Sequence, residues 1–401
     1  MTATDMTRNV ALLAICQAIL MTGSSLLIAT SALVGVALAD NPAWGTLPLA
    51  LQFAAMTATT VPASLLMQRL GRRPVFLAGL GFALLGVGLA VTSILQGLFG
   101  LFALASVLLG IFNGIGQFFR FAAADVAGEG NKGRAISWVL AGGIVAGFMG
   151  PNLGSWTSGW FEAAFAGSYL VLGAFYLLAI AVVAALRIPR PPRPQAGDGG
   201  RSMARIARQP GFVVAVLTAA VGYGVMNIIM VATPLAMAGH AHPFSETAFV
   251  IQWHVVAMFL PSFFTGELIR RLGVVSVIQA GVAMMLGCVA INLTGNGVWH
   301  YWAALVCLGV GWNFMFIGGT TLLTRVHDEV EKGRTQALND FLVFGIVSLT
   351  ALSASGLLEA VGWAVLNLSV LPFLLMAALA VLAYAGWWAP RQRTTQASTP
   401  G

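Results

Sequence analysis

Charged residues are scarce in this chain. Only 8% of its 401 residues are Asp, Glu, Lys or Arg, whereas 58% are hydrophobic and the mean hydropathy is +0.88. No soluble domain can bury so much apolar surface, so the solvent for most of this chain is lipid. The net charge of +7 does not require a nucleic-acid partner. The positions of the basic residues, described below, have another explanation.

Cysteine is also rare, and no arrangement of residues indicates catalysis. Cys16, Cys288 and Cys307 lie inside apolar runs without metal-finger spacing, which indicates neither a disulfide framework nor a thiolate zinc site. There is no Walker-type phosphate loop and no nucleophile paired with a base. The first apolar run is long and lacks a small-residue cleavage site, so no cleavable signal peptide is expected. These absences predict a protein that is not an enzyme and has no cofactor.

Twelve apolar runs are long enough to cross a bilayer, which requires about 20 residues. All 20 Lys and Arg residues fall on one side of this layout: before the first span, after each even-numbered span, and in the tail. By the positive-inside rule, both termini are cytoplasmic. The predicted spans are residues 9–38, 44–67, 74–95, 99–121, 135–158, 164–186, 211–238, 245–269, 274–294, 298–323, 335–358 and 363–388.

The chain repeats internally on either side of a segment rich in Pro, Arg and Gly. This segment, residues 187–210, is predicted to be a cytoplasmic linker between an N-terminal half (1–186) and a C-terminal half (211–388), which a cytoplasmic tail (389–401) follows. The sequence of residues 129–134 recurs, with changes, 200 residues further on, and Arg69-Leu70-Gly71 recurs as Arg271-Leu272-Gly273. The repeat predicts an all-α membrane protein, twelve transmembrane helices in two six-helix pseudo-repeat halves, that works by alternating access.

The connection between the second and third spans resembles the signature Gly-x-x-x-Asp-Arg-x-Gly-Arg-Arg of the major facilitator superfamily. Here it runs from Ser64 to Arg73, and Ser64 and Gln68 replace the Gly and the Asp. In the family that Asp helps to hold the cytoplasmic gate closed, and Gln68 lacks the charge that this contact uses. Residues 147–154, around Gly150-Pro151, are similar to a motif of the superfamily's drug antiporters. The resemblance implies gating or structural roles for Arg69, Gly71, Arg72, Arg73 and, in the second half, Gly266, Arg270, Arg271 and Gly273.

Two methionines and a histidine–methionine pair occupy the seventh and eighth spans. Met226 and Met230 share one face of a helix, as do His254 and Met258, and the two pairs lie at similar depths near the midplane. Thioethers and imidazole suit Cu(I). Methionine is also ordinary filler of apolar helices. An ionisable residue inside a span, such as His254, is a functional candidate, and a proton relay is an alternative role for it.

The spacing of these four residues resembles that of the CcoA-type copper importers, bacterial inner-membrane members of the superfamily that serve cytochrome oxidase assembly. The resemblance implies metal binding by Met226, Met230, His254 and Met258. It also implies import of copper across the bacterial inner membrane, with copper as transported substrate. Separately, we expect the protein to lie in the lipid bilayer as a monomer.

Two alternatives stay open: a proton-coupled importer or exporter of an organic solute, and a sensor or assembly factor that transports nothing. Arg120 is interpreted as a snorkelling anchor or as a gate partner of Asp340 or Glu267. Asp340 is a candidate for carrying a coupling proton or for pairing with Arg334. The full set of cavity or coupling candidates is Gln17, Asn113, Gln117, Arg120, Asn313 and Asp340.

Overall fold

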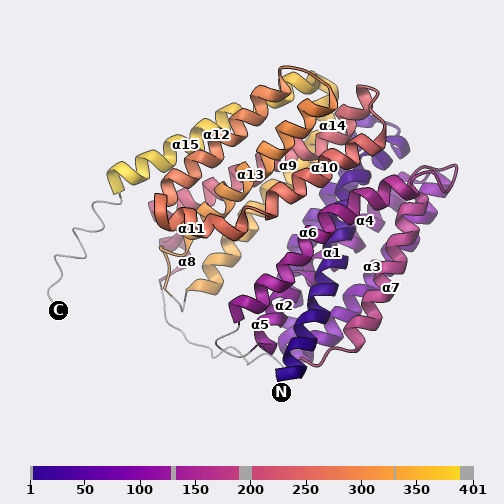
Figure 1. Cartoon of the computed structure of the whole chain (residues 1–401), viewed down its shortest axis with the longest axis horizontal. Helices are drawn as coiled ribbons and strands as arrows, with labels where there is room; N and C mark the ends of the chain where they lie inside the picture. The colour runs from indigo at the N-terminus through magenta and orange to yellow at the C-terminus, as the bar shows by residue number, and fades with distance from the viewer. Residues whose placement is uncertain (1–2, 128–131, 189–200, 329–330, 389–401) are drawn as a thin grey trace. The chain divides into compact units, whose positions relative to one another are not determined.

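The computed structural model describes residues 3–127, 132–188, 201–328 and 331–388 (Figure 1). Throughout these ranges the regular elements are helices, as the apolar runs predict. Part of the predicted linker (189–200) and the tail (389–401) lie outside the described residues. The chain is thus an all-helical, multi-pass membrane protein.

The first group of helices corresponds to the six predicted spans of the N-terminal half. Their bounds are α1 (Ala3–Leu38), the short 3-10 helix η1 (Pro42–Trp44), α2 (Leu47–Leu70), α3 (Arg72–Gln96), α4 (Phe99–Gly116), α5 (Phe119–Val126), α6 (Lys132–Thr157) and α7 (Ala166–Ala184).

The second group corresponds to the six spans of the C-terminal half. Their bounds are α8 (Met203–Ala207), α9 (Pro210–Gly239), α10 (Phe244–Phe259), α11 (Ser262–Leu272), α12 (Val274–Asn292), α13 (Val298–Leu323), α14 (Lys332–Ser369), α15 (Leu371–Ala383) and the π-helix η3 (Tyr384–Trp388). By length and composition, nine helical stretches of the described chain could each cross a membrane, or ten if the bent pair α10–α11 counts as one span. The last of these stretches, 335–386, covers two predicted spans and contains a non-helical residue, Gly362.

The predicted eighth span, 245–269, is not one straight helix. It divides into α10 and α11, which are bent by 45° relative to each other. Pro261 lies at the break and lacks the amide hydrogen that would continue the helical hydrogen bonds. The carbonyl of Met258 accepts a hydrogen bond of 2.7 Å from the Nδ2 of Asn313, a partner from outside its own helix. The bend is therefore stabilised by a side chain from α13.

Contacts divide the chain into two compact units. Unit 1 contains residues 1–195, 230–256 and 351–360, and unit 2 contains residues 196–229, 257–350 and 361–401. The boundary near residue 195 falls inside the predicted linker. Segments 230–256 and 351–360 group with unit 1 because they pack on it: Gln252, for example, accepts a hydrogen bond from Asn152. The two six-helix halves of the sequence repeat stay a prediction.

Small residues and aromatic side chains shape the interior of unit 1. A Cβ on Gly150 of α6 would lie 2.7 Å from the carbonyl oxygen of Thr22 on α1, so only glycine permits this approach. On the other side of the unit, α3 and α7 run side by side (Figure 1). Tyr169 and Tyr176 of α7 are buried and meet Phe102 and Phe112 of α4 edge to face, with ring centroids 5.7 and 5.1 Å apart.

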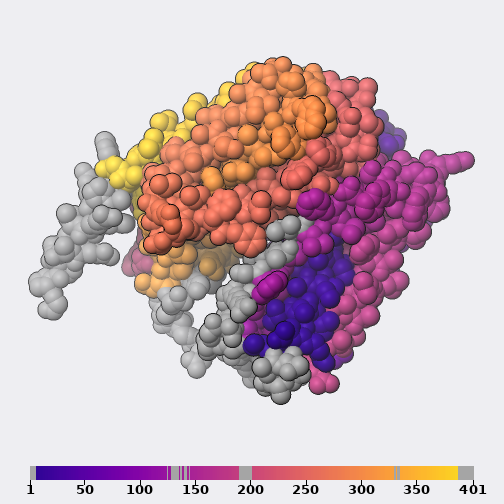
Figure 2. Space-filling model, viewed as in Figure 1, coloured from indigo at the N-terminus to yellow at the C-terminus, as the bar shows by residue number. Residues whose placement is uncertain are grey.

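Unit 2 uses the same device. Gly281 of α12 and Gly311 of α13 face each other so closely that a Cβ on either would lie 2.9 Å from the carbonyl oxygen of the other. Large apolar side chains stay on the outside. In the stretch from α11 to α13, drawn in salmon to orange in Figure 2, Phe263, Leu272 and Trp299 are exposed. Such a surface is stable in lipid and not in water.

Candidate functional site

The turn between α2 and α3 holds a partly buried ion pair. Gly71 ends one helix and begins the next with φ 91° and ψ 164°, a conformation that favours glycine. Directly after it, Arg72 is only 9% exposed and donates from Nε to Asp125 Oδ2 of α5 at 2.6 Å. Arg69 and Arg73 of the same motif are exposed. Sequence analysis missed Asp125, although a carboxylate in the connection after the fourth span, on the same predicted side as the motif, was a usable signal.

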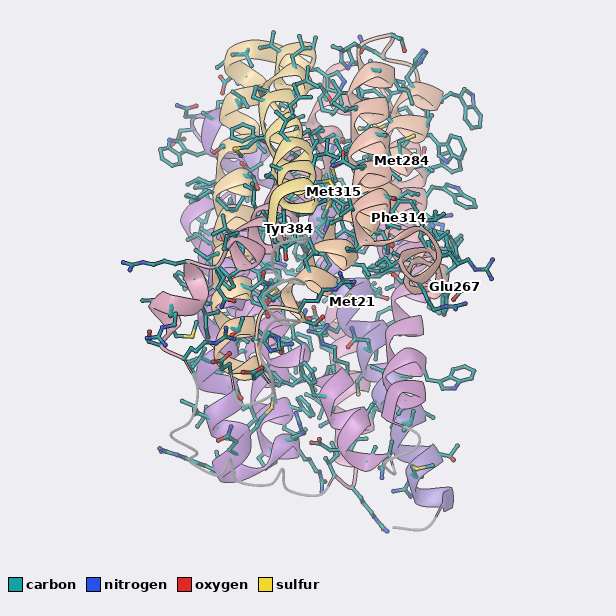
Figure 3. All side chains as sticks on the ribbon, turned by 90° about the vertical axis from the view of Figure 1, so that its left-hand side faces the viewer. Met21, Glu267, Met284, Phe314, Met315 and Tyr384 are labelled. Atoms are coloured by element: carbon teal, nitrogen blue, oxygen red, sulfur yellow. The ribbon has the colours of Figure 1, made fainter. Side chains whose placement is uncertain are left out.

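The second-half copy of this turn has a different charge pattern. Gly273 separates α11 from α12 with φ 84° and ψ 153°. Glu267, which is labelled in Figure 3, accepts hydrogen bonds from Arg270 and Arg271 on the same turn of α11. A hollow of about 540 Å³ adjoins this turn, and its lining includes Gly266, Arg270, Gly273, Val274, Arg325 and Tyr384.

The end of the linker is anchored in unit 2 by an ion pair. Arg201 donates from its backbone amide and from its guanidinium to the carboxylate of Glu331, at distances down to 2.6 Å, and also to the carbonyl of Val326. The Glu331 side chain is 1% exposed. Hydrogen bonds from Arg201 lower the pKa of Glu331 to about 2. This contact connects the linker to the loop before α14.

The structure divides the four predicted metal ligands between the two units. Met230 and His254 belong to unit 1, and Met226 and Met258 belong to unit 2. All four side chains are buried: Met226 is 1% exposed, Met230 2%, His254 0% and Met258 7%. Met258 lies at the end of α10, beside the break that Asn313 stabilises. Convergence of the four side chains on one point stays a prediction.

Three of the cavity candidates lie in or beside α4. Asn113 is buried and accepts from Ser24 of α1 at 3.3 Å, and Gln117 is half-buried at the end of α4. The guanidinium carbon of Arg120 lies 4.9 Å from the ring centre of Phe121. The three residues thus lie in sequence at or near the break between α4 and α5.

The other three candidates are distributed over three helices. Gln17 of α1 is 3% exposed, and no hydrogen-bond donor reaches its Oε1 in the part of the chain that the structure describes. Asn313 is fully buried at the α10–α11 break, where it also accepts from Thr265 at 2.6 Å. Asp340 is exposed and accepts from Asn339 at 3.0 Å.

A group of aromatic rings, which sequence analysis missed, lies near the middle of the helices of unit 2. Tyr223 of α9 has its ring centroid 5.3 Å from Trp312, 5.6 Å from Phe316 and 5.7 Å from Phe344. Trp312 and Phe316 of α13 stack at 5.1 Å with an angle of 9° between planes. We call Tyr223, Phe259, Trp312, Phe316 and Phe344 the aromatic cluster. The four-residue spacing of Trp312 and Phe316, which places them on one helix face, was the available signal.

Two buried polar atoms border the aromatic cluster. Asn227, one turn after Tyr223, is fully buried and donates from Nδ2 to Val347 O and Thr350 Oγ1, both at 3.0 Å. Among the described residues, its Oδ1 accepts no hydrogen bond and the indole Nε1 of Trp312 donates none. One acceptor and one donor are thus available beside the rings.

Two sets of side-chain hydrogen bonds join segments of unit 1 that are far apart in the sequence. The hydroxyls of Thr46 and Ser355 are 2.9 Å apart, and Ser355 also donates to Ala43 O at 2.7 Å. Asn152 donates from Nδ2 to Gln252 Oε1. These contacts join the α1–α2 connection to α14 and join α6 to α10.

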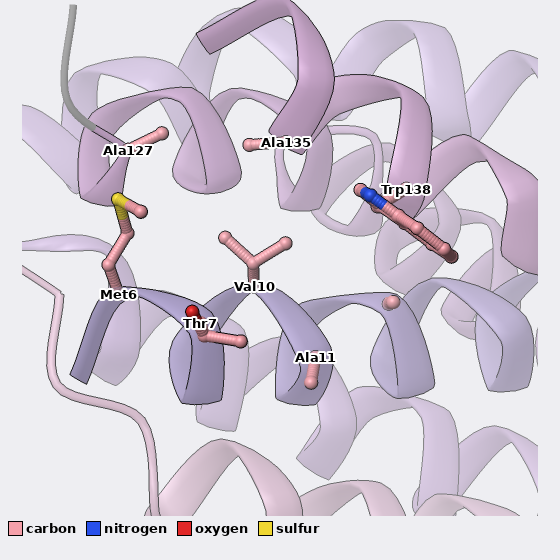
Figure 4. Close-up of a pocket in the computed structure, with 8 residues that line it drawn as sticks. Met6, Thr7, Val10, Ala11, Ala127, Ala135 and Trp138 are labelled. Atoms are coloured by element: carbon pink, nitrogen blue, oxygen red, sulfur yellow. The ribbon is translucent and has the colours of Figure 1, made fainter. Parts of the chain in front are cut away.

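A hollow of about 370 Å³ lies near the start of α1 (Figure 4). Met6, Val10, Ala127, Ala135 and Trp138 contribute to its apolar lining, and Thr7 is its polar member. None of the described residues that line it carries a charge.

Comparison with known proteins identifies the relatives of this chain. The model of the Major Facilitator Superfamily matches residues 13–351. The riboflavin transporter RfnT of Brucella anthropi is 40% identical over 376 residues, which cover 92% of this chain and 94% of the relative. Two uncharacterized MFS-type transporters of Bacillus subtilis are also similar. YdeG is 28% identical over 79% of this chain and 77% of the relative, and YddS is 31% identical over 69% of this chain and 67% of the relative.

The prediction of copper import is wrong. A relative that covers nearly the whole chain is named for riboflavin, an organic solute, and nothing supports the narrower resemblance to copper importers. Thioether side chains also fill apolar interiors, so the spacing of Met226, Met230 and Met258 does not distinguish a ligand from a packing residue. The alternative prediction, an organic solute, fits the relatives better.

Proposed function

Because the chain belongs to the major facilitator superfamily, we propose that it transports riboflavin, or a flavin closely similar to it, across the bacterial inner membrane by alternating access. The observation that carries this proposal is the 40% identity, spread over 92% of the chain, with a riboflavin transporter. Identity over the full length includes the spans from which a transport cavity is built.

The proposed mechanism assigns a task to each end of the helices. Both termini are cytoplasmic, and the halves 1–186 and 211–388 rock about the linker 187–210. The Thr46–Ser355 contact lies at the end of α1 opposite the N-terminus, so it closes the outer side and separates when that side opens. The partly buried Arg72–Asp125 pair holds the cytoplasmic ends of α3 and α5 together while the halves move.

The solute determines what the cavity must supply. Riboflavin combines a planar aromatic ring system with a chain of hydroxyl groups, and hydroxyls are costly to move through hydrocarbon without hydrogen-bond partners. Gln17, Asn113 and Gln117 offer side-chain amides, which both donate to and accept from hydroxyls. Amides of this kind are the partners that the hydroxyl chain of the solute needs.

Uptake by purified protein in liposomes tests this function. We expect time-dependent, saturable accumulation of riboflavin, with protein-free liposomes as the control for leakage. Reconstitution places the protein in both orientations, so transport in either direction is detected. Riboflavin accumulation equal to that of protein-free liposomes, under inward and outward gradients of riboflavin and of protons, would contradict the proposal.

A further inference from the structure

Resting on the proposed function, we propose that the aromatic cluster of unit 2 is the subsite for the flavin ring system. Tyr223, Trp312 and Phe344 lie near the middle of α9, α13 and α14, at the depth where transporters of this kind bind their solutes. A tricyclic ring that must leave water needs a platform of similar planar surfaces. In this unit, the aromatic cluster is a platform built from four helices, because Phe259 adds α10 with its centroid 6.1 Å from Trp312.

The burial pattern of the cluster fits a platform that keeps some surface for a ligand. Trp312 is 6% exposed and is held by its stack on Phe316. Tyr223, Phe316 and Phe344 are half-buried, so each keeps part of its ring uncovered. A bound aromatic ring contacts these surfaces by stacking, as nucleobases stack on aromatic side chains in nucleic-acid complexes.

The polar atoms beside the rings match the polar edge of a flavin. The pyrimidine portion of the ring presents carbonyl oxygens next to an N–H group. Trp312 Nε1 is a donor for a carbonyl, and Asn227 Oδ1 is an acceptor for the N–H; neither has a protein partner in the described chain. A buried polar atom without a partner carries a desolvation cost that a ligand with the matching group removes.

Asn227 is also fixed in orientation. Its Nδ2 is committed to Val347 O and Thr350 Oγ1 of α14, so its Oδ1 is the atom left for a ligand. Phe344 precedes Val347 by three residues and therefore lies on the same face of α14. The same two helices thus supply a stacking surface and an oriented acceptor.

Equilibrium binding of three probes to the purified full chain tests this subsite. The probes are riboflavin, lumichrome, which keeps the tricyclic ring without the hydroxyl chain, and ribitol, which keeps the hydroxyl chain without the ring. We expect lumichrome to displace riboflavin from the wild type and ribitol to displace it poorly. We expect Trp312→Ala to raise the Kd for riboflavin and for lumichrome about tenfold or more, which corresponds to about 1.4 kcal/mol. Trp312→Phe keeps a ring and loses the donor, so its Kd rises by a smaller factor.

Trp363 provides the matched control. It is another buried tryptophan of unit 2 and is 7% exposed. Its ring centroid lies 5.5 Å from that of Tyr301, outside the aromatic cluster. We expect Trp363→Phe to bind riboflavin and lumichrome as the wild type does. Thermal unfolding of each variant in detergent shows whether it has folded. If Trp312→Ala does not fold, the Kd of Trp312→Phe is the measurement that tests the subsite.

The outcomes separate this inference from the proposed function. If the wild type neither binds nor transports riboflavin, the proposed function fails. If the wild type binds riboflavin and a folded Trp312→Ala or Trp312→Phe binds it with unchanged Kd, only the subsite is overturned. The same holds if ribitol displaces riboflavin better than lumichrome does, since the binding energy then lies in the hydroxyl chain.

Discussion

The two copies of the basic turn share a backbone and differ in what they bind. Gly71 and Gly273 have nearly the same conformation, and each separates two consecutive helices. After Gly71 comes Arg72, which pairs with Asp125 of a neighbouring helix. After Gly273 comes Val274, and the position 200 residues beyond Asp125 is Arg325. Val274 and Arg325 line a hollow of about 540 Å³ instead of forming an ion pair.

This difference shows which parts of a repeat are preserved by geometry and which by partners. The turn between the two helices needs a residue that tolerates a positive φ, so the glycine recurs in both copies. An ion pair needs two complementary residues far apart in sequence, and one substitution removes it. In the second copy the acid is Glu267, which binds Arg270 and Arg271 on its own helix and, among the residues that the structure describes, forms no ion pair with another helix.

The largest expected effect comes from breaking the pair that joins two helices. Removing one partner of a buried ion pair costs about 3–5 kcal/mol, and we expect Arg72→Ala to fall at the lower end because Asp125 is 28% exposed. Thermal unfolding of the purified protein in detergent measures the loss. Arg270→Ala is the matched change in the second copy, where the arginine is 73% exposed, and we expect no measurable shift. Equal shifts for the two variants would show that the two turns are equivalent.

The second largest difference in stability loss is expected between alanine variants of the two repeated asparagines, Asn313 and Asn113. Asn313 makes three hydrogen bonds, to Met258 O, Ser262 Oγ and Thr265 Oγ1, all at 2.6–2.7 Å. Asn313→Ala leaves buried groups at the α10–α11 bend without partners, and we expect it to cost about 2–3 kcal/mol of unfolding free energy.

Within the part of the chain that the structure describes, the counterpart of Asn313 in the first half, Asn113, makes one side-chain hydrogen bond, of 3.3 Å, with Ser24. We therefore expect Asn113→Ala to cost about 0.5–1.5 kcal/mol, less than Asn313→Ala costs. Unfolding of both variants side by side in one detergent gives the comparison. A larger loss for Asn113→Ala would mean that the bend does not depend on Asn313.

The turn glycines should be equally sensitive, which tests the shared half of the comparison. At φ of 84–91° a side chain is strained whatever the space around it, and we expect Gly71→Ala and Gly273→Ala each to cost about 1–2 kcal/mol. At Gly273 an added Cβ meets no atom within 4 Å, so backbone strain alone acts there. Losses that differ by more than the experimental error, measured by thermal unfolding, would mean that only one of the two turns retains its conformation in the membrane.

What the sequence could predict follows the same division. Hydrophobic runs and the repeat locate the helices, because lipid requires each span to satisfy its own backbone. The break at Pro261 was missed because prolines are tolerated inside other helices of this chain, such as Pro62 in α2 and Pro234 in α9.

Local spacing was least informative about the solute. Met226 and Met230 have the spacing of ligands and equally that of packing residues. The aromatic cluster draws on four helices, so no local pattern contains it. Asp125 and Glu331 likewise acquire roles from partners 53 and 130 residues away.

Acid should lower the stability that the Arg201–Glu331 ion pair gives to the second half of the chain, whereas the corresponding position of the first half cannot titrate. Near neutral pH this change in stability is the smallest of the predicted effects. Hydrogen bonds from Arg201 lower the pKa of Glu331 to about 2 in the folded protein. A carboxyl whose folded pKa is lowered contributes stability above its unfolded pKa, about 4.3, and loses it as the pH falls through the folded value. We therefore expect Glu331 to make no contribution to the pH dependence of stability between about pH 8 and 6, and we expect Tm to fall from about pH 4 to 2.

The variant Glu331→Gln tests this assignment. It should lower Tm at neutral pH and reduce the fall of Tm between about pH 4 and 2. Position 131, which corresponds to Glu331 in the first copy, is Asn131 and cannot titrate. An unchanged acid slope in Glu331→Gln would assign the acid response to other carboxylates.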